Sequence, residues 1–307
     1  MELIAPYVKR RCIGGSDIPS VLKTGQRYVE SGYAVTYDFM VEELGTIGEV
    51  RRAHAVHLEL GRSMNDTNRG NIAIKPSMAG LSLETANPTV ADRTFEKYLS
   101  ELLRTFHASG TEIEVDAESS AQLPHKLAVI NELRKTLPKK WTKGLRVAVQ
   151  MHLADITKHA EAHKLFEYPV RIVKGAGVYK EDPRLIVDKK EIERRALQYA
   201  YEAFCNGERP YIATVRDRKY IRGLLHDLRC LGVKKDQFEI QLLHGIGWSL
   251  ARELHDEGYV VRIYIPFVTP FCKDAWKPYV ARRIMTLASA WFNDYASRFH
   301  SDDTAIS

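Results

Sequence analysis

The sequence predicts an α/β fold, a (β/α)8 barrel of the TIM type preceded by an N-terminal helical arm. Eight short apolar runs, several rich in β-branched residues and without polar alternation, indicate strands that are covered on both faces. Longer segments with helical spacing lie between these runs, which is the order expected of a parallel α/β barrel. A doubly wound open sheet is the alternative. It would usually carry a GxGxxG turn after its first strand, and this chain has none.

The predicted elements follow one another along the whole chain. The apolar runs lie at 34–40, 71–75, 111–116, 145–151, 168–174, 210–215, 237–243 and 259–267. Helical patterns are clearest at 47–64, 93–108, 189–207 and 219–232, and the last two end on a glycine, which commonly terminates helices. We therefore expect a helical arm at 1–33 that packs on the barrel, the barrel itself at 34–296, and a tail at 297–307. The polar composition of the tail predicts fraying.

Composition and charge exclude several classes of protein. The chain has 307 residues, 45% of them hydrophobic, and its net charge of +6 is spread out rather than blocked, so we expect no nucleic-acid partner. The four cysteines form no CxxC pair, so we expect neither a metal site nor disulfides, and a cytoplasmic location. No apolar run approaches the roughly 20 residues of a membrane span. Any membrane contact is expected to be peripheral, through the basic segment 9–11.

Polar side chains recur at the carboxyl ends of the predicted strands, where the active sites of such barrels lie. Each of them alone fits a solvated loop residue, a core amide bonded to backbone, or a turn glycine. Their common placement at one end of the barrel indicates a site. The candidates are Lys75, Asp116, Gln150, Arg171, Lys174, Gly175, Thr214, Gln241 and Tyr264.

The segment after the last predicted strand adds a basic helical face. A helix is expected to start at Trp276, which places Tyr279, Arg282 and Arg283 at positions i, i+3 and i+4 on one face. Two guanidinium groups beside an aromatic wall can hold a carboxylate by paired hydrogen bonds. The alternative is a solvated basic turn, but the aromatic residues on the same face argue against it.

Seven segments, in fixed order and spacing, carry a family resemblance. They are VTYDFMVEELG (35–45), AIK (73–75), EVDAES (114–119), VAVQ (147–150), VRIVKGA (170–176), FEIQLLHGIGWSLARELHDEGYVVRIYIPF (238–267) and WKPYVARR (276–283). Together they resemble the FAD-dependent proline dehydrogenase family in its monofunctional form, which consists of the barrel alone. The combination of VRIVKGA with the Tyr-x-x-Arg-Arg motif is the specific part of the match.

The resemblance implies a distorted (β/α)8 barrel with FAD bound noncovalently at the carboxyl ends of its strands. The implied activity is the oxidation of L-proline to pyrroline-5-carboxylate, with hydride passing from ring C5 to flavin N5. The implied partners are the amino-acid substrate and a quinone or other electron acceptor that reoxidises the flavin.

The resemblance also assigns roles to single residues. Arg282, Arg283 and Lys75 are expected to hold the substrate carboxylate, and Asp116 to pair with this cationic cluster. Tyr264 and Tyr279 are expected to pack on the substrate ring, over an apolar floor at Leu243. The residues expected to contact FAD are Gln150, Arg171, Val173, Lys174, Gly175, Thr214 and Gln241.

The chain departs from the family pattern at three places. Gly177 stands where the family usually has an aromatic residue that walls the substrate pocket, and Tyr179 comes two positions late. Val215 stands where a histidine usually approaches the flavin, and Arg216 follows it. Thr286 stands where an acidic residue usually follows the paired arginines. These changes leave the carboxylate clamp intact and alter the ring side of the pocket and the surroundings of the flavin.

Two alternatives therefore stay open. Gly177 leaves room for a larger cyclic or N-substituted amino acid, which would be oxidised by the same flavin chemistry. The missing histidine and acidic residue would also fit a barrel that binds a carboxylate without redox activity. The intact Lys75, Asp116, Arg282 and Arg283 oppose the second alternative.

Overall fold

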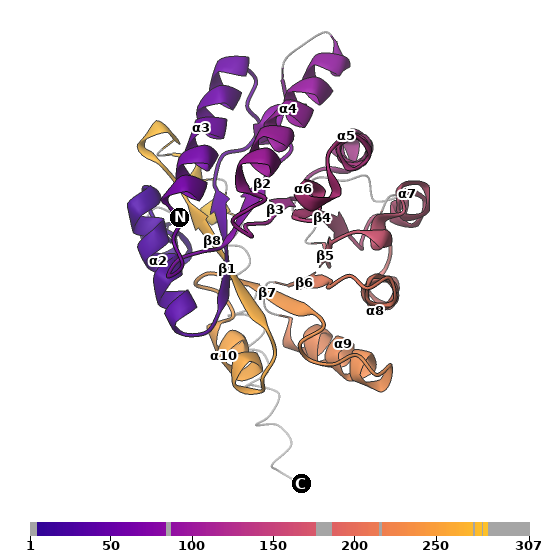
Figure 1. Cartoon of the computed structure of the whole chain (residues 1–307). Coiled ribbons are helices and arrows are strands. Elements are labelled where there is room, and N and C mark those ends of the chain that lie inside the picture. Colours follow the sequence, from indigo (N-terminus) through magenta and orange to yellow (C-terminus); the bar gives the residue numbers. More distant parts are fainter. Residues whose placement is uncertain are drawn as a thin grey trace.

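The fold is a closed barrel of eight parallel strands. The computed structural model describes residues 5–83, 87–175, 186–214, 217–272, 274–277 and 279–281. Figure 1 shows the strands at the centre with the helices around them, so the predicted α/β barrel is confirmed. The strands are β1 Ala34–Phe39, β2 Asn71–Ile74, β3 Ile113–Val115, β4 Leu145–Gln150, β5 Val170–Val173, β6 Tyr211–Ala213, β7 Glu239–Leu243 and β8 Val261–Phe267.

Consecutive strands pair all the way round, and β8 closes on β1. That closing pair is the longest ladder, running from Ala34 opposite Arg262 to Phe39 opposite Phe267. The β3–β4 ladder is short and ends at Val115 opposite Val147. Because all strands are parallel, their carboxyl ends meet at one rim of the barrel.

The helices lie mostly outside the strands. They are α1 Ala5–Cys12, α2 Ile18–Glu30, α3 Ile47–Ser63, α4 Pro88–Phe106, α5 Leu123–Thr136, α6 Lys139–Thr142, α7 Ile156–His163, α8 Lys189–Cys205, α9 Arg218–Cys230 and α10 Trp248–Asp256. The α3 helix starts at a capping box, in which Thr46 and Glu49 each bind the other's backbone N–H. Asp188 caps α8 through the N–H of Glu191.

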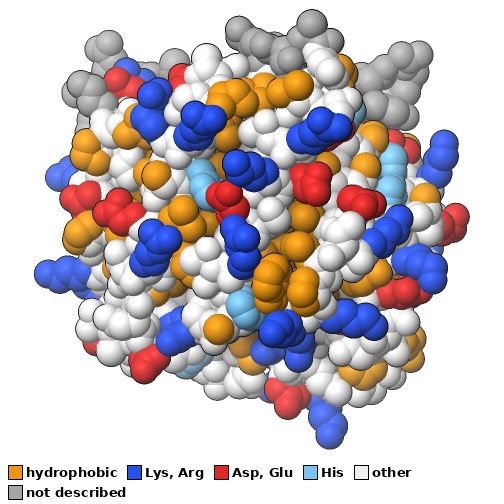
Figure 2. All heavy atoms as spheres, turned by 45° about the horizontal axis from the view of Figure 1, so that its top comes forward, with side chains coloured by type: hydrophobic (Ala, Val, Ile, Leu, Met, Phe, Trp, Pro, Cys, Tyr) orange, Lys and Arg blue, Asp and Glu red, His pale blue; other side chains and the backbone are white. Residues whose placement is uncertain are grey.

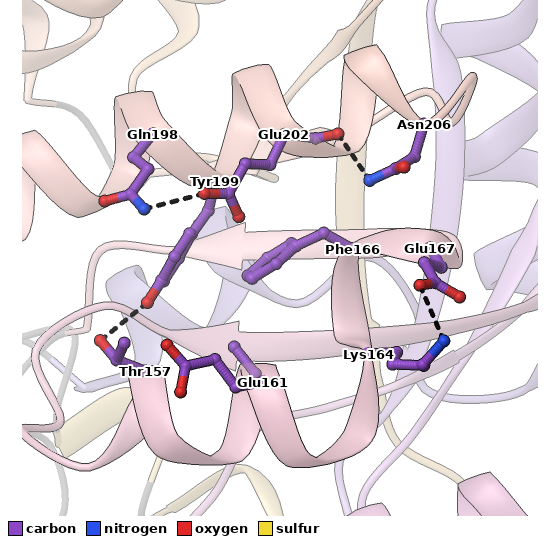
Figure 3. Close-up of a pocket in the computed structure, with 10 residues that line it drawn as sticks. Thr157, Glu161, Lys164, Phe166, Glu167, Gln198, Tyr199, Glu202 and Asn206 are labelled. Atoms are coloured by element: carbon purple, nitrogen blue, oxygen red, sulfur yellow. Dashed lines mark hydrogen bonds and ion pairs between the residues drawn. The ribbon is translucent and has the colours of Figure 1, made fainter.

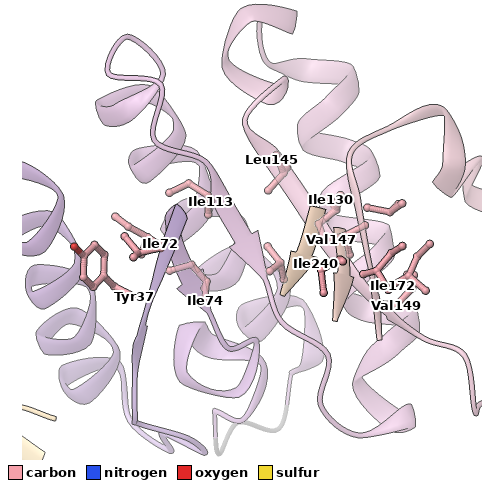
Figure 4. Packing of buried hydrophobic residues seen from close by; sticks show 14 of the residues in the cluster. Tyr37, Ile72, Ile74, Ile113, Ile130, Leu145, Val147, Val149, Ile172 and Ile240 are labelled. Atoms are coloured by element: carbon pink, nitrogen blue, oxygen red, sulfur yellow. The ribbon is translucent and has the colours of Figure 1, made fainter. Parts of the chain in front are cut away.

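The main core fills the space between the strands and the surrounding helices. Figure 4 shows Ile72, Ile74, Ile113 and Val147 among the strand residues of this core, and all four are fully buried. Burying a side chain of this size contributes about 1.5–3 kcal/mol. The apolar runs of the sequence therefore correspond to strands that are covered on their outer face by helices.

Inside the barrel, the end opposite the strand carboxyl termini is charged. Arg262 pairs with Glu239, and Arg146 lies 3.1 Å from Glu112. The Tyr211 hydroxyl donates to Glu112 Oε2 at 2.9 Å, and the ring of Tyr211 lies under the guanidinium of Arg146. This end of the barrel interior is thus partly filled by a network of buried ion pairs.

The N-terminal helices form the expected arm, and they pack on the barrel. The backbone of residues 14–15 bonds to the end of β8, through Gly14 N to Pro266 O at 2.7 Å and Val268 N to Gly15 O at 3.1 Å. Arg11 Nε donates to Gly245 O at 2.8 Å in the loop after β7. The arm therefore crosses the rim next to β7 and β8.

The surface carries mixed charge. On the face shown in Figure 2, basic and acidic side chains are interspersed rather than gathered into a block of one sign. Across the residues that the structure describes, no helix is long and apolar enough to cross a membrane. In the same ranges, no three His, Cys, Asp or Glu side chains come together in a way that could hold a metal ion.

Candidate functional site at the rim of the barrel

Asp116 is the centre of a buried polar cluster at the carboxyl rim. It follows β3 directly, and the Tyr264 hydroxyl of β8 donates to its Oδ2 at 2.6 Å. Arg171 of β5 forms an ion pair with Oδ1, and its guanidinium stacks 4.7 Å from the centroid of the Tyr264 ring. Three predicted site residues from different strands thus lie in direct contact.

Lys75 lies next to this cluster and is held by β1. Its ammonium pairs with Asp38 and donates to Phe39 O at 3.1 Å. Burial alone would lower the pKa of Lys75, but the carboxylates of Asp38, Glu42 and Asp116 together raise it. Lys75 is therefore a cation at neutral pH, as a carboxylate site requires.

The pKa values of the carboxyl groups around Lys75 are shifted in opposite directions. Burial raises the pKa of Asp38 to about 6, although Lys75 opposes the shift. Burial also raises the pKa of Glu118 to about 7, and this side chain accepts from Ser77 N and Oγ, each at 2.7 Å. Burial acts in the same sense on Asp116, but Arg171 and Lys75 outweigh it and lower its pKa.

A second group of polar residues continues the rim from β4 to β6. Gln150 ends β4 opposite Val173, which ends β5, and the backbone N–H of Thr214 bonds to Gln241 O at 3.1 Å. Lys174 forms an ion pair with Asp217, the N-cap residue of α9. This arc is the side of the rim where the resemblance expects the cofactor.

Position 175 can be occupied only by glycine in this backbone conformation. Its φ is +89°, and a Cβ there would lie 1.8 Å from Nδ1 of the buried His152. The backbone of the loop after β5 therefore approaches the imidazole ring more closely than any other residue type would allow.

One expectation on β7 needs correction. Gln241 was expected at the end of its strand, but β7 continues to Leu243. The amide of Gln241 donates to Glu114 Oε2 at 3.0 Å and lies deeper in the barrel, while its Oε1 has no hydrogen-bond partner within the described part of the chain. Leu243, half-buried at the rim opposite Tyr264, packs against the cluster that contains Tyr279.

Tyr279 is buried in a small apolar cluster at the rim beside the N-terminal arm. Its partners come from α1, from the loops after β1, β7 and β8, and from its own helical segment: Val8, Cys12, Met40, Ile246, Val268 and Val280. Lys9 lies over the ring of Trp276 at 4.5 Å. Arg282, Arg283 and Thr286 lie outside the described residues, as do Gly177, Tyr179, Val215 and Arg216.

Comparison with known proteins decides the family. The family model for proline dehydrogenase matches residues 21–191, more than half of the chain. This chain belongs to the proline dehydrogenase family. Proline dehydrogenase 2 of Bacillus subtilis strain 168 is 23% identical over 276 residues, covering 89% of this chain and 84% of the relative. A proline dehydrogenase of Deinococcus radiodurans is 32% identical over 117 residues, covering 38% of this chain and 35% of the relative.

Solved structures of proline utilization A (PutA) proteins share the fold. The proline utilization A (PutA) protein of Bdellovibrio bacteriovorus, solved after inactivation by N-propargylglycine, superposes with a TM-score of 0.78 at 18% identity, covering 91% of this chain. The PutA D779W mutant of Bradyrhizobium japonicum gives a TM-score of 0.69 at 19% identity, covering 90% of this chain. This chain spans about a third of either PutA chain, 32% and 30% of their lengths.

Sequence reasoning missed two buried residues of this proline dehydrogenase fold, Asp38 and Lys126, and it noted Glu118 after the third strand without giving it a role. Asp38 could have been found, because it is a charged residue inside the first apolar run. Glu118 gave only its place after the third strand as a signal and Lys126 gave none, since both follow β3 in a polar stretch that looks solvated. Their burial, 6% and 2% exposed, is decided by how the loop after β3 and the helix α5 fold back on the rim.

One surface hollow among the described residues lies away from this rim. Figure 3 shows it between α7 and α8, with a volume of about 260 Å³ and the stacked rings of Phe166 and Tyr199 along one wall. Glu202 and Lys164 beside it are already bonded to Gln198 and Glu167. It lies on the outer face of the barrel and brings together none of the predicted site residues.

Proposed function

We propose that this chain oxidises L-proline to pyrroline-5-carboxylate with FAD as the oxidant. Membership of the proline dehydrogenase family supports this. The single observation that carries the proposal is the buried rim cluster of Asp116, Arg171 and Tyr264 with Lys75 beside it. A cluster of fixed cations and a phenol at the mouth of a barrel suits a small anionic substrate.

In this proposal the substrate carboxylate is held by Lys75 together with Arg282 and Arg283. Charge-assisted bonds from several cations fix the position of the ring, which is the positional part of catalysis. Tyr264, Tyr279 and Leu243 form the apolar side that receives the ring methylenes. Asp116 binds Arg171 and Tyr264, so that the cationic cluster keeps its shape.

The residues present fit FAD on two observations. Arg171 Nε is buried without a hydrogen-bond partner among the described residues, so it is available to an acceptor on a ligand. The left-handed Gly175 brings backbone into the same arc without a side chain. Gln150, Arg171, Val173, Lys174, Gly175 and Thr214 would hold the group. Gln241, which donates to Glu114, could contribute only its amide oxygen.

FAD held by these residues would supply the oxidant, as the acceptor of the hydride that leaves ring C5. The substrate nitrogen contributes its lone pair to the new C=N bond as that C–H bond breaks, so no side chain has to act as a strong base. The role left to the chain is to bind the neutral amine with its carboxylate clamped. A quinone or another acceptor would then reoxidise the flavin.

The visible absorbance spectrum of the purified protein tests the proposal. We expect flavin bands that bleach when L-proline is added without oxygen. Bands that persist would leave a flavoenzyme with a different amine substrate. A protein that shows no bands even after FAD is added would contradict the proposal and favour a barrel that only binds a carboxylate.

Gly177 is the observation that favours a larger cyclic or N-substituted amino acid as the substrate. If the pocket is enlarged there, Gly177→Tyr should gain turnover of L-proline and lose turnover of N-methylproline. If L-proline is the substrate, the same change should give no gain with it. Steady-state kinetics with the two compounds separates these outcomes.

A further inference from the structure

Lys126 is a buried lysine on the outer side of the barrel wall, directly behind Asp116. It is the fourth residue of α5, and its side chain is almost completely covered. Its ammonium donates to Asp116 O at 3.2 Å and to Ala148 O at 2.9 Å. One side chain thus joins the end of β3 to β4.

The place of these two carbonyl groups is informative. The β3–β4 ladder ends at Val115 opposite Val147, so Asp116 and Ala148 are the next pair, beyond the last ladder contact. Asp116 is still held on its other side, where its N–H donates to Ile74 O at 2.8 Å. Lys126 takes the position of the missing ladder bond and completes the support of Asp116 from the β4 side.

Keeping a cation in this place is unfavourable in itself. Burial lowers the pKa of Lys126 to about 8, with the carboxylates of Asp116 and Glu118 opposing the shift. The positive end of the α5 macrodipole and the guanidinium of Arg171 also disfavour the charged form of Lys126. Its favourable contacts are therefore the two carbonyl bonds and the field of the two carboxylates, and all of these belong to the rim.

We propose that Lys126 is a positioning residue of the active site, which fixes the backbone of Asp116 and through it the placement of Arg171 and Tyr264. The inference rests on the proposed function for its catalytic consequence. Its structural part, that Lys126 fixes the end of β3, stands independently of that function.

Lys126→Met is the test, because it keeps the length of the side chain and removes all N–H donors. Arg134→Met is the matched control. Arg134 is also a buried cation of α5 and also donates to a β4 carbonyl, Leu145 O at 3.4 Å, but at the opposite end of that strand. Lys126→Gln restores N–H donors without the charge, and it serves as a second variant if Lys126→Met folds poorly.

Two readouts are compared in these variants. We expect Lys126→Met to raise KM for L-proline roughly tenfold and to leave kcat within about twofold. The tenfold rise corresponds to the loss of about two hydrogen bonds. Hydrogen exchange of the backbone over residues 113–118 should become faster. Arg134→Met should change neither readout, even if its melting temperature falls equally, and Lys126→Gln should recover part of both.

The outcomes separate the two proposals. If Lys126→Met lowers the melting temperature but leaves both KM and exchange at 113–118 unchanged, Lys126 is only structural and the inference is wrong. Faster exchange at 113–118 in Arg134→Met as well would also overturn it. If the wild-type enzyme does not oxidise L-proline, the proposed function fails, and the exchange comparison alone then decides whether Lys126 fixes Asp116.

Discussion

Single residues at the rim do several tasks at once. Asp116 is bonded through its side chain to Arg171 and Tyr264 and through its backbone to Ile74 and Lys126. A carboxylate fixed in this way holds its cationic partner in one orientation. The resemblance implied that Asp116 pairs with the cluster of Lys75, Arg282 and Arg283, whereas its ion-pair partner in the structure is Arg171, which was expected beside FAD. The sequence could not show this, because the pairing depends on which strands face each other across the barrel mouth.

Lys75 provides a test at the residue scale. Lys75→Met should raise KM for L-proline about 10- to 100-fold, because a charged hydrogen bond to a carboxylate contributes about 1.5–3 kcal/mol. Flavin content should stay unchanged. Steady-state kinetics and the visible spectrum measure the two effects.

The Lys75→Met change also leaves Asp38 buried without its partner. The double variant Asp38→Asn/Lys75→Met therefore serves as the control. It should recover stability without recovering KM. If the double variant regained normal KM, the effect would come from the unpaired Asp38 and Lys75 would not bind the substrate.

At the scale of elements, the helix α1 supports the segment that carries Tyr279. Val8 and Cys12 of α1 pack against Tyr279 and Val280 in one apolar cluster, together with side chains from three rim loops. The arm was expected to pack on the barrel, and it does. That it contacts the segment just before the paired arginines follows from the tertiary structure alone.

Cys12→Asp tests this support. Placing a carboxylate in an apolar cluster that excludes water costs several kcal/mol unless the surrounding residues move. We expect the Tyr279 segment to shift and KM for L-proline to rise by about tenfold or more. A tenfold rise corresponds to a loss of about 1.4 kcal/mol of substrate binding free energy.

Tyr7→Asp, on the exposed face of the same helix, is the matched control for Cys12→Asp. It introduces the same side chain outside the cluster and should leave KM unchanged. Equal effects of the two variants would contradict the role given to α1.

At the scale of the whole molecule, stability depends on pH through buried histidines. His57 of α3 is fully buried against Phe39 and bonded to the Tyr98 hydroxyl at 2.7 Å. Burial lowers its pKa to about 3 in the folded state. In the unfolded chain the histidine has a pKa near 6.5 and binds a proton that it does not bind in the folded chain. The free energy of unfolding therefore falls as the pH drops below about 6.5.

His57→Gln removes this titration and can still bond to Tyr98. From about pH 7 to about pH 5, wild type should lose roughly 2 kcal/mol more free energy of unfolding than the variant does. Asp38 and Glu118, with raised pKa values, act in the opposite sense in both proteins, so they cancel in the comparison. Denaturant unfolding at the two pH values measures it, and parallel losses in both proteins would refute the assignment.

The charged interior of the barrel gives a second test of overall stability. Arg262→Met leaves Glu239 buried without its partner and should cost about 3–5 kcal/mol of unfolding free energy. Adding Glu239→Leu should restore most of that loss, because an apolar pair needs no compensation. Chemical denaturation of both variants checks this, and an equal loss in the double variant would show that packing rather than charge dominates.

The sequence by itself determined the barrel, since apolar runs and helical spacing reflect local periodicity and burial, which each segment carries in its own residues. It also placed polar side chains at several strand ends, though wrongly for Gln241, and indicated the family through motif spacing. Only the tertiary structure decided the pairing of Lys75 with Asp38, the depth of Gln241, and the burial of Glu118 and Lys126. These features depend on contacts between segments far apart in the chain. A local sequence pattern does not show how close two such segments come or how far their side chains are removed from water.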